Sequence, residues 1–523
     1  WRSEWAVQRG SVSDGPLYSG DPLTPGVGAT ADAKRLDRKD ARTLTKIPVL
    51  PISYADAQPL LAAIGGPVAP ATWRGALPLT YHLGPGPATV RLRIQSDWSR
   101  KTLYDVIATL PGSEAPDQWI VRGNHRDAWV FGASDPFSGH VAWLAEAKSI
   151  GALARQGFRP RRTLVYASWD GEEPGLIGST EWVETHAAEL RAKTALYINT
   201  DVSQRGVLEV EGSQALRRFV SEIAAGIEDP ETHVNLVQRE RAVARVNAYE
   251  AETPPPRLEA DLPLGALGSG SDYTPFLQHL GIASLNISFG GEERYGVYHS
   301  AYDSFDHYSR FVDPSFEYGV ATAKVAGHAV LRAAQAPLLP VRAGDLGQAV
   351  STYVQELHKL ADSLRAKAEL QSALLQEDAF KIAADQTQKR AAPKEIPKPP
   401  HLEFAVLDNA LERLLTRARA FDTQYDRLLQ AGDSQSAARR EHCNAVLTRL
   451  ESQLTDARGL PGRPWFTHML YAPGFHTGYG VKTLPGVREA IEEYRWEEAN
   501  RYMAVIAGVL DAYGQSLESA AGR

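Results

Sequence analysis

Hydrophobic and polar residues alternate along the middle of the chain in a pattern that predicts strands and helices in succession. Four apolar runs are typical of buried strands: residues 118–123, 162–169, 195–201 and 282–289. Between the first two, residues 138–155 predict a helix, because Val141, Leu144, Ala147 and Ile150 recur at helical spacing. Such alternation predicts a parallel or mixed sheet covered on both faces, with its ligand site beyond the carboxyl ends of the strands.

The two ends of the chain have a different character. Residues 1–99 are rich in Gly and Pro, with turn signals and short β-type runs such as 88–96. From residue 339 to 523, long amphipathic patterns predict a bundle of helices, a kind of domain that commonly serves association. These helices are expected at 349–375, 401–430, 436–454 and 486–517, with a Lys/Pro linker at 393–400. We therefore expect three parts, with the alternating sheet domain at 100–338.

Composition narrows the function classes. The 523 residues are too many for one core, and a net charge of −7 without a basic, aromatic-rich block argues against nucleic acid as a partner. No run of about 18 apolar residues is present to span a membrane. The single cysteine, Cys443, excludes a disulfide or thiolate metal site within the chain, and its helical surroundings predict a buried residue rather than a nucleophile. The chain opens without Met or a signal-peptide pattern, so we expect a fragment or processed form, with any anchor or targeting segment upstream of it.

Six side chains with metal or acid–base chemistry fall at or just after the predicted strand ends. They are His125, Asp135, Glu172, Glu173, Asp201 and His299. Two imidazoles and three carboxylates are enough for two zinc ions that share one carboxylate, and the remaining carboxylate is left to act as a base. The adjacent Glu172 and Glu173 suit a division of labour in which one binds metal and the other takes a proton from water.

Each of these residues also has an ordinary structural interpretation. In HRDAW, Asp127 would accept a hydrogen bond from the second ring nitrogen of His125, but a lone His-x-Asp is more typical of a surface loop. Asp135 before Pro136 is a common helix start. The Glu172–Glu173 pair, taken alone, fits a solvated acidic turn as well as it fits a metal site. The prediction of a metal-dependent hydrolase therefore depends on five ligands that share one edge of one sheet, in a chain without the G-x-S-x-G or H-E-x-x-H patterns.

With these motifs in view, the chain resembles the glutamate carboxypeptidase II and transferrin-receptor-like group of M28-type dinuclear zinc peptidases. The resemblance runs from about WAVQRG (5–10) to the C-terminus, through GDPLTPG, HRDAWVFG, DPFSG, RTLVYASWDGEEPGLIGSTEW, LGSGSDYTPF, YHS and LPGRPWFTHMLYAP. It implies an α/β fold: a partial protease-associated (apical) domain at 1–99, a mixed-sheet zinc peptidase domain at 100–338 and a helical dimerisation domain at 339–523. A homodimer is the implied assembly.

The resemblance also assigns roles at the site. One zinc would be held by His125 and Asp201 and the other by Glu173 and His299, with Asp135 bridging them. Glu172 would be the general base, and Tyr298 would stabilise the developing oxyanion. A structural calcium ion would be bound by Thr24, Glu181 and Glu184, with the backbone of Val27 completing the site.

The implied substrate pocket departs from the glutamate-selective pattern. Tyr479 is kept and Ser271 lies in the shared SGSDYTPF stretch, whereas two arginines are replaced by Asn286 and Ser288, a lysine by Gly478 and an asparagine by Ser11. An acidic side chain would then enter without a charge partner, which is unfavourable in a partly desolvated pocket. The prediction is therefore against glutamate or folate-polyglutamate specificity.

The sequence thus predicts a homodimeric exopeptidase with two zinc ions that hydrolyses short peptides in a carboxypeptidase-like manner. Two alternatives stay open. One is an aminopeptidase or dipeptidyl-type peptidase of the same family, since SGSDYTPF fits that pattern equally well. The other is a non-catalytic receptor-like protein on the same scaffold, which would be expected to lack several ligands. From the resemblance we expect a secreted, periplasmic or outward-facing membrane-anchored protein.

Overall fold

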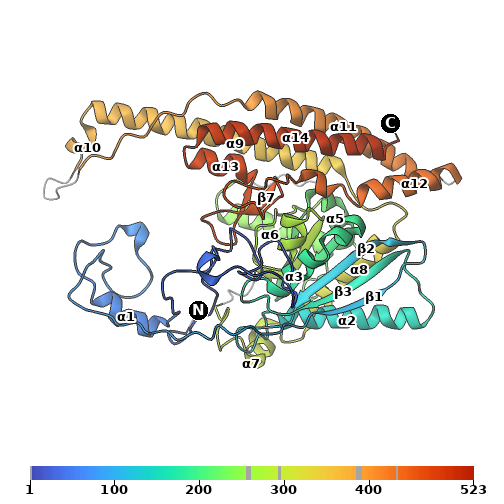
Figure 1. Ribbon diagram of the computed structural model, residues 1–523, viewed down its shortest axis with the longest axis horizontal. Coiled ribbons are helices and arrows are strands. Elements are labelled where there is room, and N and C mark those ends of the chain that lie inside the picture. Colours follow the sequence, from blue (N-terminus) through green and yellow to red (C-terminus); the bar gives the residue numbers. More distant parts are fainter. Residues whose placement is uncertain (1–2, 255–260, 292–295, 385–390, 432–433, 523) are drawn as a thin grey trace.

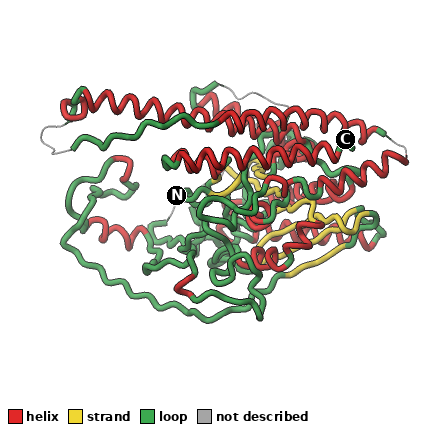
Figure 2. The backbone as a smooth tube through the Cα atoms, turned by 45° about the horizontal axis from the view of Figure 1, so that its top comes forward, coloured by secondary structure: helices red, strands yellow, loops and turns green. Residues whose placement is uncertain are grey.

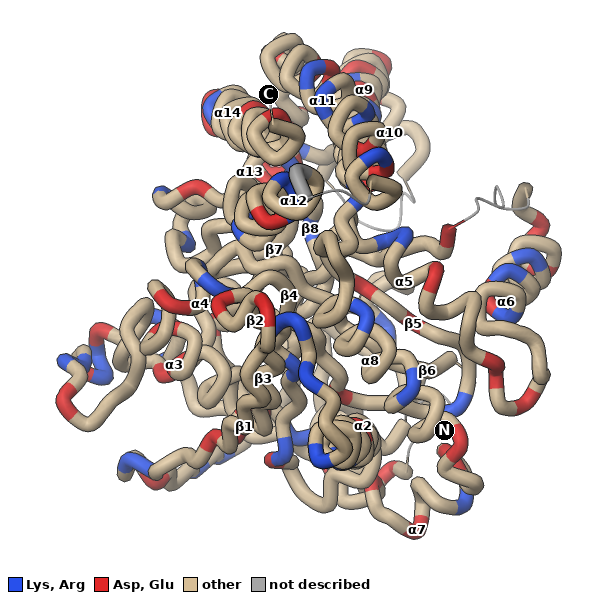
Figure 3. Tube along the Cα trace, turned by 90° about the vertical axis from the view of Figure 1, so that its right-hand side faces the viewer, with Lys and Arg blue, Asp and Glu red and all other residues tan. Residues whose placement is uncertain are grey.

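The computed structural model describes residues 3–254, 261–291, 296–384, 391–431 and 434–522. Figure 1 shows three regions: N-terminal segments with little regular structure, a central sheet with its helices, and a layer of long helices above it. The long loops of the N-terminal region are also clear in Figure 2. Figure 3 shows the helical layer on one side of the sheet and α2 on the other.

The central sheet has six strands in the order β1-β3-β2-β4-β6-β5. Their bounds are β1 Val106–Leu110, β2 Ala115–His125, β3 Arg162–Trp169, β4 Thr194–Asn199, β5 Gly206–Gly212 and β6 Ser284–Gly291. The outer strands β1 and β5 are antiparallel to their neighbours, and the four inner strands are parallel. The carboxyl ends of β2, β3, β4 and β6 therefore open on one edge, as the alternating pattern predicts. A short hairpin joins β7 Tyr471–Pro473 to β8 Val481–Thr483.

The predicted strands and the observed ones differ mainly in where they end. The prediction for 162–169 coincides with β3, and β2 extends the predicted 118–123 in both directions to reach His125. β4 ends at Asn199, so Asp201 lies on the following loop rather than at the end of the strand. The predicted β-type run at 88–96 is wrong: this segment is exposed and pairs with no described strand.

The helices cover both faces of the sheet and build the C-terminal layer. α1 Tyr54–Ala62 lies in the N-terminal region, away from the sheet (Figure 1). Around the sheet lie α2 Phe137–Arg155, α3 Ile177–Thr185, α4 Ala187–Lys193, α5 Arg217–Ala224, α6 Leu236–Glu250, α7 Phe305–His307 and α8 Glu317–Gln335. The layer contains α9 Ala343–Gln376, α10 Ala379–Ile382, α11 Phe404–Gln430, α12 Ser434–Leu447, α13 Pro485–Glu492 and α14 Trp496–Ala520. α2 and α8 pack side by side on one face of the sheet, and α9, α11 and α14 run alongside one another (Figure 1).

Helix α2 forms where it is predicted, but it buries only part of the predicted stripe: Ile150 is buried and Ala147 packs against the core. Val141 and Leu144 are 59% and 49% exposed, whereas Trp143 and Glu146 on the neighbouring positions are buried. Glu146 faces the sheet because it pairs with the buried Arg122 at 3.1 Å and accepts a hydrogen bond from the Tyr166 hydroxyl. A buried, fully paired carboxylate cannot be recognised from apolar periodicity.

The predicted helix 486–517 is interrupted. α13 ends at Glu492 and α14 begins at Trp496, because Tyr494 adopts a left-handed backbone conformation with φ of 62°. No Gly or Pro marks the break, so the sequence pattern did not reveal it. Cys443 is buried in α12, as predicted, and burial raises the pKa of its thiol to about 12. Among the described residues, no helix is long and apolar enough to cross a membrane.

Candidate metal centre

The six candidate side chains converge at the edge where the parallel strands end. His125 is the last residue of β2, and the Glu172–Glu173 pair follows β3 by three and four residues. Asp201 follows β4 by two residues, while Asp135 comes two residues before α2. His299 lies on the segment between β6 and α7. Asp135 does not cap α2, because the N-cap position is Pro136 and no side chain accepts there, so the helix-start interpretation does not account for it.

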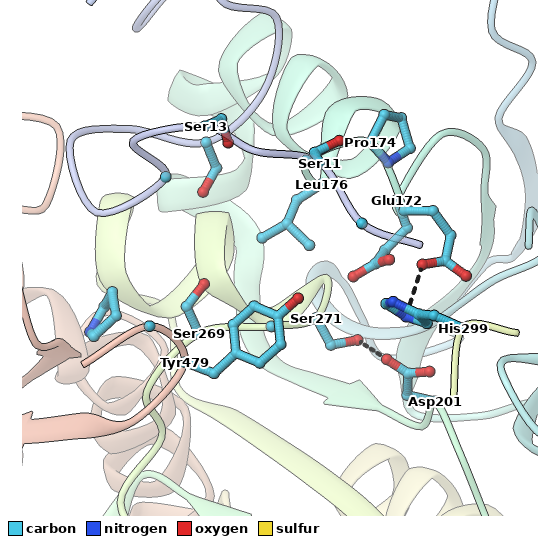
Figure 4. A pocket seen from close by; sticks show the side chains of 18 of the residues that line it. Ser11, Ser13, Glu172, Pro174, Leu176, Asp201, Ser269, Ser271, His299 and Tyr479 are labelled. Atoms are coloured by element: carbon cyan, nitrogen blue, oxygen red, sulfur yellow. Dashed lines mark hydrogen bonds and ion pairs between the residues drawn. The ribbon is translucent and has the colours of Figure 1, made fainter. Parts of the chain in front are cut away.

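The side chains form two clusters of three (Figure 4 labels several of them). In the first, the His125 Nε2 atom lies 3.0 Å from Asp201 Oδ1 and 3.9 Å from Glu172 Oε2. In the second, His299 Nε2 lies 3.2 Å from both Asp135 Oδ2 and Glu173 Oε2. Asp135, a member of the second cluster, also faces the first, because its other oxygen, Oδ1, is 3.6 Å from His125 Nε2.

This donor set fits two zinc ions. Two ligand atoms that each lie about 2.0–2.1 Å from a tetrahedral ion are about 3.3 Å apart. The ligand separations of 3.0, 3.2 and 3.6 Å around the two imidazoles fall around that value. Imidazole nitrogen and carboxylate oxygen are both zinc ligands, and Asp135 offers one oxygen to each cluster, as a bridging carboxylate does.

The side chains of the two clusters have shifted pKa values, because they are buried together and carry charges close to one another. Burial raises the pKa values of Asp135 and Glu173, and it raises that of Glu172 well above its ordinary value. Burial alone would lower the pKa of His299, but hydrogen bonds to Asp135 and Glu173 outweigh it and raise the value to about 9. Bound cations relieve the repulsion among the carboxylates and displace the protons from the imidazoles, so the arrangement favours metal binding.

Each of the two candidate ligand imidazoles is held through its second nitrogen by a backbone carbonyl. His125 Nδ1 lies 3.1 Å from the carbonyl oxygen of Asp127, and His299 Nδ1 lies 2.9 Å from that of Arg9. Such contacts fix the tautomer so that Nε2 is free for the metal. The Asp127 carboxylate, which was expected to do this for His125, is farther away at 3.5 Å.

Both oxygens of Asp127 instead hold the loop that carries the Glu pair. They accept the backbone N–H groups of Glu172 and Glu173 at 3.0 and 3.1 Å. In the same way, the buried Asp303 accepts the backbone N–H groups of Ser134 and Asp135 at 2.8 and 3.1 Å. Sequence reasoning missed Asp303 and Arg9, because their roles depend on contacts between segments far apart in the chain.

A cavity of about 440 Å³ opens from the two clusters, and the residues proposed for substrate binding line it. Asn286 and Ser288 come from β6, and Tyr479 lies on the loop between β7 and β8 (Figure 4). Tyr298 also lines it, and burial raises the pKa of its hydroxyl, which therefore remains protonated as a hydrogen-bond donor. None of the described lining residues is Lys or Arg. Ser271 lines the cavity too, but its hydroxyl donates to Asp201 at 2.6 Å.

The three residues matched to a calcium site also lie together. Glu181 accepts a hydrogen bond from the Thr24 hydroxyl at 3.3 Å, and Glu184 accepts the backbone N–H of Gly26 at 2.9 Å. One carboxylate oxygen of Glu184, Oε2, is buried without a hydrogen-bond partner. Burial raises the pKa values of Glu181 and Glu184 to about 8 and about 7.

Comparison with known proteins agrees with this geometry. The model of peptidase family M28 matches residues 105–315, and that of the transferrin receptor-like dimerisation domain matches residues 402–518. The chain is 31% identical over 496 residues to the probable glutamate carboxypeptidase LAMP1 of Arabidopsis thaliana, covering 94% of this chain and 63% of that protein. It is 29% identical over 539 residues to the aminopeptidase NAALADL1 of Mus musculus, covering 98% and 66%. The chain thus spans about two thirds of the length of these relatives.

Solved structures give a weaker likeness. A zinc aminopeptidase from Bacillus subtilis is 21% identical, with 44% of this chain and 50% of that chain covered and a TM-score of 0.30.

Proposed function

We propose that this chain, which belongs to peptidase family M28 and carries a transferrin receptor-like dimerisation domain, is a co-catalytic dinuclear zinc exopeptidase that hydrolyses short peptides. One observation carries the proposal: Asp135 directs one carboxylate oxygen toward each of two imidazoles, within two clusters of metal-binding side chains. His125 and Asp201 would hold one zinc, Glu173 and His299 the other, and Asp135 would bridge them. All five ligands and the base are present, which favours an enzyme over a receptor-like protein.

The chain's own groups supply the proton transfers. Zinc, when bound, would act as a Lewis acid on the scissile carbonyl and on water. Glu172 is buried within the first cluster, and its carboxylate would take a proton from the attacking water and deliver it to the nitrogen of the leaving amine. The protonated Tyr298 hydroxyl would donate a hydrogen bond to the carbonyl oxygen as negative charge develops on it. Asp127 keeps Glu172 in place through the backbone.

The pocket supports a carboxypeptidase-like or aminopeptidase-like enzyme without glutamate specificity. The relatives carry both names, so which peptide end is recognised remains a choice between these two. Asn286 and Ser288 present neutral side chains to the cavity, and no described lining residue offers a cation to an acidic side chain. Peptides with neutral side chains are therefore the expected substrates, and profiling of a mixed peptide library by mass spectrometry identifies the end that is cleaved.

The replacement of Glu172 by Gln tests the assignment. The amide cannot accept a proton as the carboxylate does, so turnover is expected to be abolished while both zinc ions remain bound. The exposed Glu189→Gln on α4 is the matched control and should keep full activity. Zinc analysis of the purified wild-type protein separates the alternatives: two ions per chain support the enzyme, and none supports the receptor-like protein. Unchanged turnover in Glu172→Gln refutes the base.

Two further assignments belong to the same proposal. Thr24, Glu181 and Glu184 would bind a structural calcium ion, which the unpartnered Glu184 oxygen supports. The helical domain would form a homodimer, since α9 and α11 keep exposed apolar side chains such as Leu370 and Val406. Sedimentation velocity of the purified chain measures the assembly, and a monomer at micromolar concentration would contradict it.

A further inference from the structure

A continuous line of hydrogen bonds runs from the core of the sheet to the candidate metal ligand Asp201. The Trp169 indole N–H donates to the Tyr197 hydroxyl at 3.1 Å, and this hydroxyl donates to Asn199 Oδ1 at 2.8 Å. The Asn199 amide then donates to the Ser271 hydroxyl at 2.9 Å, which donates to Asp201 Oδ2 at 2.6 Å. Figure 4 shows the last of these bonds. We call this line the Asn199 relay.

The chemistry of its two ends fixes the direction of every bond in the relay. An indole N–H can only donate and an ionised carboxylate can only accept. Each hydroxyl between them therefore accepts a hydrogen bond from the Trp169 side and donates one toward Asp201. Hydrogen bonds aligned in this way polarise one another inside a protein of low dielectric constant. The relay therefore ends in a strong, charge-assisted bond to one oxygen of Asp201. The other oxygen, Oδ1, is left facing His125 Nε2 at 3.0 Å.

The same amide also holds the wall of the substrate cavity. The second hydrogen of Asn199 Nδ2 is donated to Asn286 Oδ1 at 3.0 Å, across the β4–β6 pairing that places these two residues side by side. With this bond the carbonyl oxygen and both amide hydrogens of Asn199 are all used, and its side chain is fully buried. One side chain thus connects a metal ligand with a residue that faces the substrate.

Gly123 on β2 is an independent sign that the relay is built into the sheet. It pairs with Asn199 on β4, and a Cβ atom at this position would collide with the Tyr197 hydroxyl and the Trp169 indole nitrogen. Any other residue here would displace the first two members of the relay. The absence of a side chain at Gly123 leaves the space in which they meet.

We propose that Asn199 is a positioning residue that fixes Asp201 and Asn286 relative to each other and to the core of the sheet. Asp201 lies two residues beyond β4, so its carboxylate needs a partner outside the strand ladder to hold its orientation. The relay supplies this partner through Ser271, and the second amide hydrogen of Asn199 holds Asn286 in the cavity wall. The inference rests on the proposed zinc function, which it extends from the ligands to the residues behind them.

The test compares two variants that each remove one buried hydroxyl from the same sheet. Tyr197→Phe breaks the relay, whereas Tyr166→Phe removes the bond to Glu146 on the opposite face, and neither residue lines the cavity. We expect both to lower the melting temperature and only Tyr197→Phe to weaken zinc binding, measured by competition with a chelator. Equal zinc affinity in the two variants, both folded, overturns the relay. A wild-type protein without zinc affinity would instead overturn the proposed function.

Variants nearer the metal keep the test decisive if Tyr197→Phe fails to fold. Loss of a residue that holds a metal ligand typically lowers metal affinity 10–100-fold. We expect Ser271→Ala to lower zinc affinity by about this factor. Ser271→Thr keeps the hydroxyl and should restore the affinity. Asn199→Leu should weaken zinc binding and raise KM together, while Asn286→Ala should raise KM alone. If Asn199→Leu leaves zinc affinity unchanged, the amide does not connect the two sites.

Discussion

The replacement of Asp127 by Asn tests how the Glu172–Glu173 loop is held. The native carboxylate accepts two backbone N–H groups, one on each oxygen, at 3.0 and 3.1 Å. The amide keeps one acceptor oxygen and turns an N–H₂ group toward the other backbone N–H, which is left without a partner. A buried donor without an acceptor costs about 1–3 kcal/mol. If this cost falls on the position of the base, kcat decreases about 5- to 150-fold, because about 1.4 kcal/mol is a factor of ten.

The zinc ion that His125 is proposed to bind should be retained in this variant. The second nitrogen of His125 contacts the backbone carbonyl of residue 127, which the substitution does not remove. The assay is therefore kcat for a cleaved peptide at saturating zinc, together with the zinc content. Asp170→Asn is the matched control, because Asp170 lies on the same loop and accepts the backbone N–H of Tyr104, but does not line the cavity. Unchanged kcat at saturating zinc, together with weaker retention of zinc, would refute this reasoning. It would show instead that the Asp127 carboxylate orients His125.

Three other outcomes are expected. The pKa of His299 is raised to about 9 without metal, and the imidazole must lose its proton to bind zinc. Zinc affinity, measured by competition with a chelator, should therefore strengthen from about pH 6 to about pH 9. An affinity that does not change with pH would contradict this. The raised pKa values of Glu181 (about 8) and Glu184 (about 7) mean that their protonated forms favour the calcium-free fold. The stability that these two groups contribute is therefore fully present below their ordinary pKa of 4.5 and is lost as pH rises toward about 8. The rise in melting temperature with calcium over a chelator should grow across this range, and an equal rise at every pH would exclude the site. Asn286→Arg combined with Ser288→Arg should increase kcat/KM for peptides with acidic side chains relative to neutral ones, and no change would show that these side chains do not contact the substrate.

The residues that carry the chemistry could be found from local pattern because parallel strands share an edge. Apolar runs located β3 and β6, and the polar side chains after each run identified the candidate ligands. The burial of Glu146 could not be found in this way, since it depends on Arg122 from another element. The break at Tyr494 depends on a backbone conformation that its own residue type does not favour.

The sequence by itself determined the donor types, the strands that present them and the resemblance to a group of zinc peptidases. Only the tertiary structure decided that Asp135 faces both imidazoles, that Asp127 holds the backbone of the Glu pair, and that Asn199 joins Asp201 to the cavity wall. The physical reason is the range of the interactions. Strand formation follows from side chains a few residues apart, whereas Ser271 and Asp201 are 70 residues apart and meet only when β4 and β6 pair.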